Sequence, residues 1–161
     1  MGNYFMMSMK SNPNLRADYG LAPSEEPDVF IRLSDHTKWK ARDLYDYGRG
    51  LEEGYHKIPM PSFPELIDII LYSDDDEDKK GAAAVVLGDF AEKLLDKCFE
   101  IFAEEKELLR YYDFFGILQL QNPINRSPTI GKHFSDISKD FKKWEEIAKK
   151  VSEVLEESKS P

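Results

Sequence analysis

Apolar residues recur at helical spacing through most of the second half of the chain. Between residues 83 and 102 they follow one another at intervals of three and four, which predicts one continuous helix of roughly seven turns. The segment Glu107 to Leu120 is apolar nearly all round, which indicates a buried central helix. From Phe134 a heptad seam predicts a terminal helix of roughly 20 residues. The first stripe comprises Ala83, Val86, Leu87, Phe90, Ala91, Leu94, Cys98 and Phe102, and the seam comprises Ile137, Phe141, Trp144, Ala148, Val151 and Leu155.

A further helix is predicted after the short apolar run at residues 29–33. That run is rich in β-forming residues and fits either a single strand or an apolar lead-in. Ser34 or Asp35 would cap a helix that runs to about Tyr47 and ends at the following glycines. Its expected apolar side consists of Trp39, Leu44 and Tyr47, and the glycines are Gly48 and Gly50.

The prolines between residues 55 and 64 predict a stiff connection, because proline cannot continue a helix. Ser62 and Glu65 then have the spacing of a capping box, in which each side chain bonds the other residue's backbone N–H. They predict the start of another helix, whose buried face would carry Leu66, Ile69 and Ile70.

Together these segments predict an all-α protein, an orthogonal bundle of about five helices. Residues 1–28 hold prolines and a glycine without a sustained period, so they are expected to form an irregular N-terminal arm. Residues 29–161 would form a single helical domain, and the absence of a repeat at fixed period argues against a stacked solenoid.

Composition limits the class of protein. The chain has 161 residues, of which 41% are hydrophobic and 33% charged, enough apolar content for its own core. Cys98 is the one cysteine, so no intramolecular disulfide forms. The sequence shows no signal peptide, no complete myristoylation pattern and no apolar run long enough to span a bilayer, which together predict a cytoplasmic protein without membrane contact.

The negative charge is concentrated in one part of the sequence. Residues 65–109 contain 14 acidic residues and five lysines, which equals the whole formal charge of −9. Such a field disfavours nucleic acid and favours a basic protein partner. The alternative is that the acids only keep the protein soluble. The residues expected to bind the partner are Asp75, Asp76, Asp78, Glu92 and Asp96.

No pattern of known catalytic chemistry is present, so the sequence predicts no enzyme, no cofactor and no metal site. Glu53-x-x-His56 has half of a di-metal spacing, but no second copy follows. The acid run at residues 74–78 matches the first ligand positions of a calcium loop, yet Lys79 and Val85 stand at its diagnostic positions. A site assembled by the fold from histidines and carboxylates stays open as an alternative, and the histidines are His36, His56 and His133.

Two resemblances add to this interpretation. Residues 74–90, an acidic start followed by an Ala-rich segment that ends in Leu-Gly, resemble one HEAT-type repeat, which implies α/α packing of neighbouring helices. As a small acidic chain, the protein is also similar in type to bacterial immunity and antitoxin proteins, which neutralise basic toxins. That similarity implies an acidic helical protein-binding module of inhibitor type. The alternative is a self-assembling protein that forms a homodimer through residues 134–155.

Overall fold

The computed structural model describes residues 3–7, 15–46, 51–104 and 106–159. The chain divides into two compact units, Met1–Val85 and Val86–Pro161, and the division falls within helix α3 (Asp76–Asp89). Each unit is described by itself. Within the described ranges, no helix combines the length and the apolar character needed to cross a membrane.

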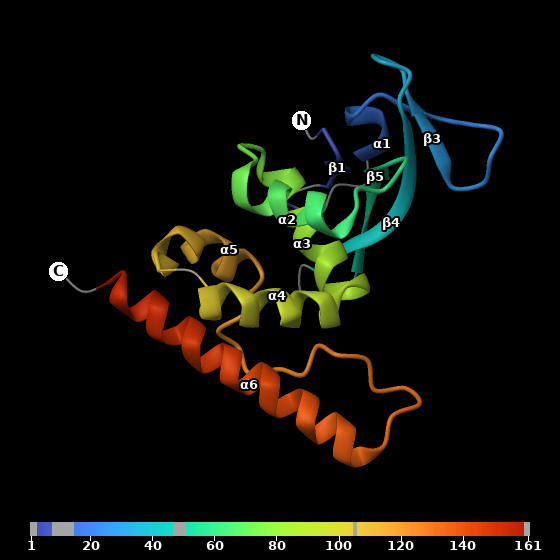
Figure 1. The fold of residues 1–161 in the computed structure, drawn as a ribbon. Coiled ribbons are helices and arrows are strands. Elements are labelled where there is room, and N and C mark those ends of the chain that lie inside the picture. The colour runs from blue at the N-terminus through green and yellow to red at the C-terminus, as the bar shows by residue number, and fades with distance from the viewer. Residues whose placement is uncertain (1–2, 8–14, 47–50, 105, 160–161) are drawn as a thin grey trace. The chain divides into compact units, whose positions relative to one another are not determined.

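The first unit contains a five-stranded antiparallel sheet of order β1-β5-β4-β3-β2 (Figure 1). The all-α prediction is therefore wrong, because the protein has a mixed α/β fold. The predicted irregular arm is also wrong for residues 3–7 and 15–28, which contribute two strands and a one-turn helix; residues 1–2 and 8–14 lie outside the described residues. The elements are β1 (Phe5–Met6), α1 (Leu15–Asp18), β2 (Leu21–Pro23), β3 (Val29–Arg32), β4 (Lys38–Asp46) and β5 (Leu51–Lys57).

Strand β4 occupies most of the segment for which the sequence predicted a helix. Its register with β5 shifts between Asp43 and Tyr45, so Leu44 is an extra residue that forms a bulge. Trp39 and Leu44 are both buried, but Leu44 lies against Gly54 on the face of the sheet opposite to that of Trp39. Because both faces of the strand carry buried apolar residues, the segment does not show the alternation typical of a half-buried strand. Residues 47–50, where the helix was expected to end, lie outside the described residues.

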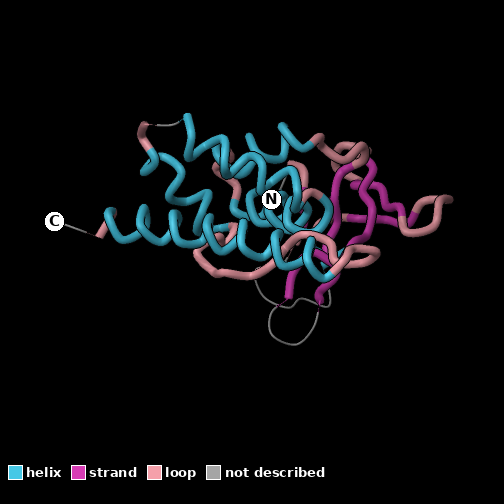
Figure 2. The backbone as a smooth tube through the Cα atoms, turned by 60° about the horizontal axis from the view of Figure 1, so that its bottom comes forward, coloured by secondary structure: helices cyan, strands magenta, loops and turns pink. Residues whose placement is uncertain are grey.

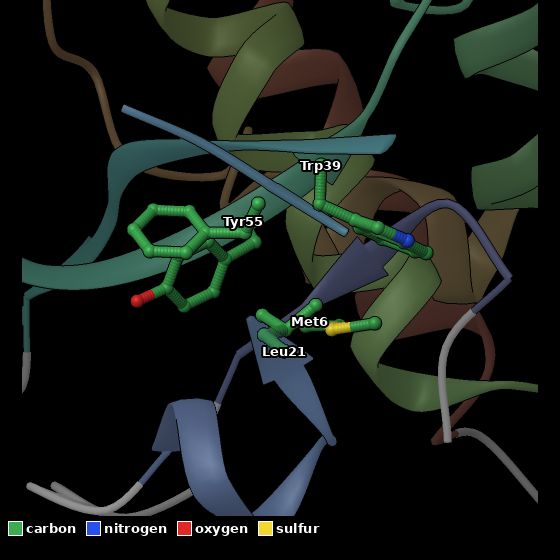
Figure 3. Packing of buried hydrophobic residues seen from close by; sticks show 5 residues of the cluster. Met6, Leu21, Trp39 and Tyr55 are labelled. Atoms are coloured by element: carbon green, nitrogen blue, oxygen red, sulfur yellow. The ribbon is translucent and has the colours of Figure 1, made fainter. Parts of the chain in front are cut away.

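One face of the sheet carries the aromatic core of the first unit. The strand register pairs Met6 with Tyr55 and Phe30 with Trp39, which places these side chains on the same face. Leu21 completes the cluster, and Figure 3 shows its side chain beside Met6. Phe5 precedes Met6 along β1 and therefore points to the opposite face.

Helix α2 (Phe63–Tyr72) begins where the sequence predicted, with Ser62 as its N-cap. The expected capping box is not formed, because the Ser62 hydroxyl makes no hydrogen bond to the helix backbone. Instead it donates to the Glu65 carboxylate over 2.9 Å. The expected buried face is confirmed, and it comprises Leu66, Ile67, Ile69 and Ile70.

The single helix of seven turns is wrong, because α3 ends at Asp89 and α4 (Ala91–Glu104) begins after Phe90. Gly88 and Asp89 are both weak helix formers, which explains the break at this point. The Leu94 N–H donates to the Phe90 carbonyl over 2.8 Å, so hydrogen bonding resumes directly after the break.

The segment 107–120 forms a 3₁₀ turn, η1 (Leu108–Tyr111), and a short helix, α5 (Tyr112–Ile117), rather than one long helix. It ends in a Schellman motif: the Leu120 N–H donates to the Phe115 carbonyl, and Gln119 has a φ of +52°. Because glycine usually takes that position, no local stop signal for the helix is visible there. Leu109 and Tyr112 are exposed, and the buried residues are Tyr111, Phe114, Phe115, Leu118 and Leu120.

Helix α6 (Phe134–Glu157) confirms the predicted terminal helix and packs against α4, α5 and η1 (Figure 2). Only part of the seam is buried. Phe134 is 85% exposed and Phe141 40% exposed, whereas the later part of the helix faces the core of the second unit. Its buried residues are Trp144, Ile147, Ala148, Val151 and Val154.

Candidate functional site

An open hollow of about 440 Å³ lies in the first unit between α2, the start of α3 and the beginning of the chain. We call it the acidic hollow. Its lining combines carboxylates with tyrosine side chains, and all of it belongs to residues 1–85. The lining residues are Asn3, Tyr4, Glu65, Asp68, Ile69, Tyr72, Ser73 and Asp78.

Helix α2 supplies one wall of the acidic hollow. Glu65, Asp68 and Tyr72 follow one another at intervals of three and four, so they share one face of the helix. Tyr72 is 65% exposed, so much of its side chain lies at the surface of the hollow. Ile69 is buried beside them and anchors this wall to the core.

Asp78 of α3 holds the opposite wall by binding the backbone of the N-terminal segment. Its Oδ1 accepts the N–H groups of Tyr4 and Phe5, each over 2.9 Å, and its Oδ2 accepts the N–H of Asn3 over 3.0 Å. One carboxylate thus satisfies three consecutive backbone donors, which fixes Tyr4 at the edge of the hollow. The Asp78 side chain is consequently buried, with its residue only 1% exposed.

Gly81, one turn further along α3, allows the same segment to approach the helix closely. A Cβ atom at this position would lie 2.3 Å from Cγ of Phe5, which is fully buried. Only glycine leaves room for the ring. Asp78 and Gly81 together therefore anchor β1 by its backbone and by its first side chain.

The acid run at the start of α3 has specific structural roles. Asp75 caps the helix, because its Oδ1 accepts the Asp78 N–H over 2.9 Å. Glu77 accepts the Met7 N–H over 3.1 Å and the Tyr19 hydroxyl. Burial and the contact with Glu77 raise the pKa of Tyr19. These bonds add to the favourable interaction of acids with the positive end of the helix dipole.

The five acids that the sequence proposed for partner binding do not form one group in either unit. Asp78 is buried and its carboxylate binds the backbone of residues 3–5, so it is not available for a partner. Asp75 is half-buried as a cap, whereas Asp76 is exposed in the first turn of α3. Glu92 and Asp96 belong to α4 in the second unit, where Glu92 forms a salt bridge of 2.9 Å with Lys132.

Of the residues that line the hollow, the sequence proposed only Asp78 for partner binding, and it missed Tyr4 and the residues of α2. The Glu65-x-x-Asp68-x-x-x-Tyr72 spacing was available as a signal, since it places all three on one helix face. Tyr4 had no such signal, because its position depends on a hydrogen bond to Asp78, 74 residues away in sequence.

The three histidines occupy separate elements. His56 is buried in β5, and because Glu53 is three residues away, the two side chains point to opposite faces of the strand. His36 is exposed in a turn with a φ of +59°, and His133 is the exposed N-cap of α6. In the described part of the chain, no group of three or more histidine, cysteine or acidic residues is arranged to hold a metal ion.

A second cluster in the first unit shows how this protein holds an arginine. The Arg16 Nε donates to the Tyr55 hydroxyl over 2.6 Å, and its Nη2 lies 3.0 Å from the Glu53 carboxylate. The Tyr55 hydroxyl donates in turn to Glu53 over 2.5 Å. Burial, together with that bond, raises the pKa of Tyr55 to about 12, and the Tyr55 hydroxyl lowers the pKa of Glu53.

The lining of the acidic hollow is suited to a positively charged group. Among the described residues, no lysine or arginine forms a salt bridge with Glu65 or Asp68. Tyrosine rings attract cations through their faces, and carboxylates attract them by charge.

Comparison with models of known protein families, with curated proteins and with solved structures finds no match to this chain.

Proposed function

We propose that this protein is a binding module of inhibitor type that docks a positively charged side chain of a basic protein partner in the acidic hollow. The observation that carries the proposal is the lining of the hollow. It combines two carboxylates, Glu65 and Asp68, with the exposed rings of Tyr4 and Tyr72.

The distribution of charge supports a basic partner. All three carboxylates that line the acidic hollow belong to the segment 65–109, which carries the formal charge of −9. A negative field of this kind raises the rate at which a basic protein associates. Exposed tyrosines then supply contact area at low entropic cost, as anchor residues of protein interfaces do.

Affinity capture with matched baits tests the proposal. The wild type, an Asp68→Asn/Tyr72→Ala double variant and an Asp96→Asn variant are each exposed to native cell extract at low and high salt. We expect the wild type and Asp96→Asn to retain the same basic protein at low salt and to release it at high salt. The double variant should bind the purified partner at least about tenfold more weakly, since two anchor contacts are lost. Equal binding by all three baits would contradict the proposal.

The exposed beginning of α6 supports self-assembly as a second candidate function. The predicted interface comprised residues 134–155, but Trp144, Ala148 and Val151 are buried within the second unit and cannot contact a second copy. The interface that we propose therefore comprises residues 130–141. Ile130 is 96% exposed there, and Phe134 and Phe141, which are seven residues apart on α6, are exposed as well. Exposed apolar residues that gather on one surface mark interaction sites, and we propose a second copy of the chain as the occupant.

Sedimentation velocity tests this second candidate. Wild-type protein should shift from monomer toward dimer as its concentration rises, and a Phe134→Ser/Phe141→Ser variant should remain monomeric. A wild type that stays monomeric at the highest concentration would exclude the candidate.

A further inference from the structure

We infer that the group bound in the acidic hollow is the guanidinium of an arginine, in preference to the ammonium of a lysine. This inference rests on the proposed function, because it names the chemistry of the partner's side chain.

The Arg16 cluster shows which groups this fold uses to hold a guanidinium. A tyrosine hydroxyl accepts from Nε over 2.6 Å, a carboxylate accepts from Nη2 over 3.0 Å, and the ring of Phe30 lies beneath Cζ at 4.5 Å. The three contacts use one edge and one face of a planar cation. A lysine ammonium is a compact point charge and cannot fill all three positions at once.

The acidic hollow offers the same classes of group on two walls. Glu65 and Asp68 stand one turn apart on α2, and Tyr72 follows on the same face. Tyr4 faces them from the N-terminal segment that Asp78 holds in place. Two carboxylates can therefore accept from different edges of one guanidinium while a tyrosine ring covers its plane.

Aromatic rings alone do not select arginine in this protein. Arg32 lies over Trp39 at 4.8 Å, but Lys150 also lies over Phe102 at 5.7 Å. The selection must therefore come from the carboxylates, because a guanidinium donates two parallel N–H bonds to a carboxylate whereas an ammonium acts as a point charge. This reasoning makes Asp68 the residue that discriminates and Tyr72 the residue that adds affinity for either cation.

The inference is tested by NMR titration of the full chain with three capped tripeptides. The probes are acetyl-Gly-Arg-Gly-amide, its lysine counterpart and its neutral citrulline counterpart. We expect the arginine peptide to shift the amide signals of residues 4, 68 and 72 saturably, with a Kd about fivefold lower than that of the lysine peptide. The citrulline peptide, which keeps the shape without the charge, should cause no saturable shift.

Matched variants locate the effect in the hollow. Asp68→Asn should abolish the preference for arginine, whereas Tyr72→Ala should weaken both cations and Tyr72→Phe should restore most of the affinity. Asp96→Asn and Tyr112→Ala remove the same charge and a similarly exposed ring from the second unit, and they should leave both Kd values unchanged.

The outcomes separate the two levels of the proposal. Equal binding of arginine and lysine peptides at these signals would overturn the preference for guanidinium and leave a cation-binding hollow standing. Absence of saturable binding by either cation, or an equal loss in Asp96→Asn, would overturn the inference together with the proposed function.

Discussion

Replacement of Asp78 tests whether one carboxylate holds the N-terminal strand. A hydrogen bond to a charged group contributes about 1.5–3 kcal/mol, and the Asp78 carboxylate accepts three. Asn3 and Tyr4 are exposed enough for water to replace the carboxylate at their N–H groups, but the Phe5 bond is buried. Counting Phe5 in full and the other two at a fraction, we expect Asp78→Ala to lower the free energy of unfolding by about 3 kcal/mol.

Asp78→Asn provides a graded comparison. The amide retains one acceptor oxygen, which can still serve Tyr4 and Phe5, but it loses the acceptor for Asn3. We expect a loss of about 1 kcal/mol for this variant. Urea unfolding followed by circular dichroism measures both losses. Hydrogen exchange of residues 3–7, read by mass spectrometry, shows whether the strand has been released.

Asp76→Asn is the matched control, because it removes the same charge from the exposed first turn of α3. It should leave hydrogen exchange of residues 3–7 unchanged. The reasoning would be refuted if these amides exchanged no faster in Asp78→Ala than in the wild type. It would also be refuted if Asp78→Ala lowered the free energy of unfolding by less than Asp76→Asn does.

Three further predictions concern buried groups. Gly81→Ala should destabilise the protein by about 2 kcal/mol in urea unfolding, because its Cβ overlaps Phe5, and a stable variant would contradict the close approach. Folding raises the pKa of Tyr55 from 10.0 to about 12, so its contribution to stability is complete below pH 10 and is lost as the pH rises toward 12. Tyr55→Phe should flatten that decline in stability. An unchanged pH profile of the unfolding midpoint in this variant would contradict the contribution of Tyr55. Burial raises the pKa of the Cys98 thiol to about 12, so a disulfide reagent at pH 8 should modify it in urea but not in the native protein.

The sequence predicted the elements whose pattern is local. Helix α6 and the start of α2 are right because a heptad seam and the spacing of Ser62 and Glu65 act over a few residues. Strand β4 was misread because Trp39 and Leu44 are buried on opposite faces of the sheet, so the segment lacks the simple alternation of a half-buried strand. Strand pairing across the sheet supplies the register, and no local pattern contains it.

The charge pattern was informative about the segment and misleading about individual residues. It directed attention to residues 65–109, which provide Glu65 and Asp68 of the hollow. It could not separate Asp76, which is exposed, from Asp78, which is buried by a strand distant in sequence. Burial of an acid is decided by the donors that the fold brings to it.

The anchoring of β1 also protects the sheet from other chains. Strand β1 pairs with β5 through Phe5 and Met6, and the Lys57 N–H donates to the Tyr4 carbonyl over 2.9 Å. Without the N-terminal segment, these backbone groups of β5 would be left as an open template for intermolecular strand pairing, the usual first step of β-aggregation. On the opposite edge, β2 is only three residues long and ends in Pro23, which has no N–H to offer a neighbour. Asp78 therefore acts as a safeguard of solubility as well as a structural anchor, since its carboxylate keeps the shortest strand of the sheet in place over an edge that would otherwise recruit a second molecule.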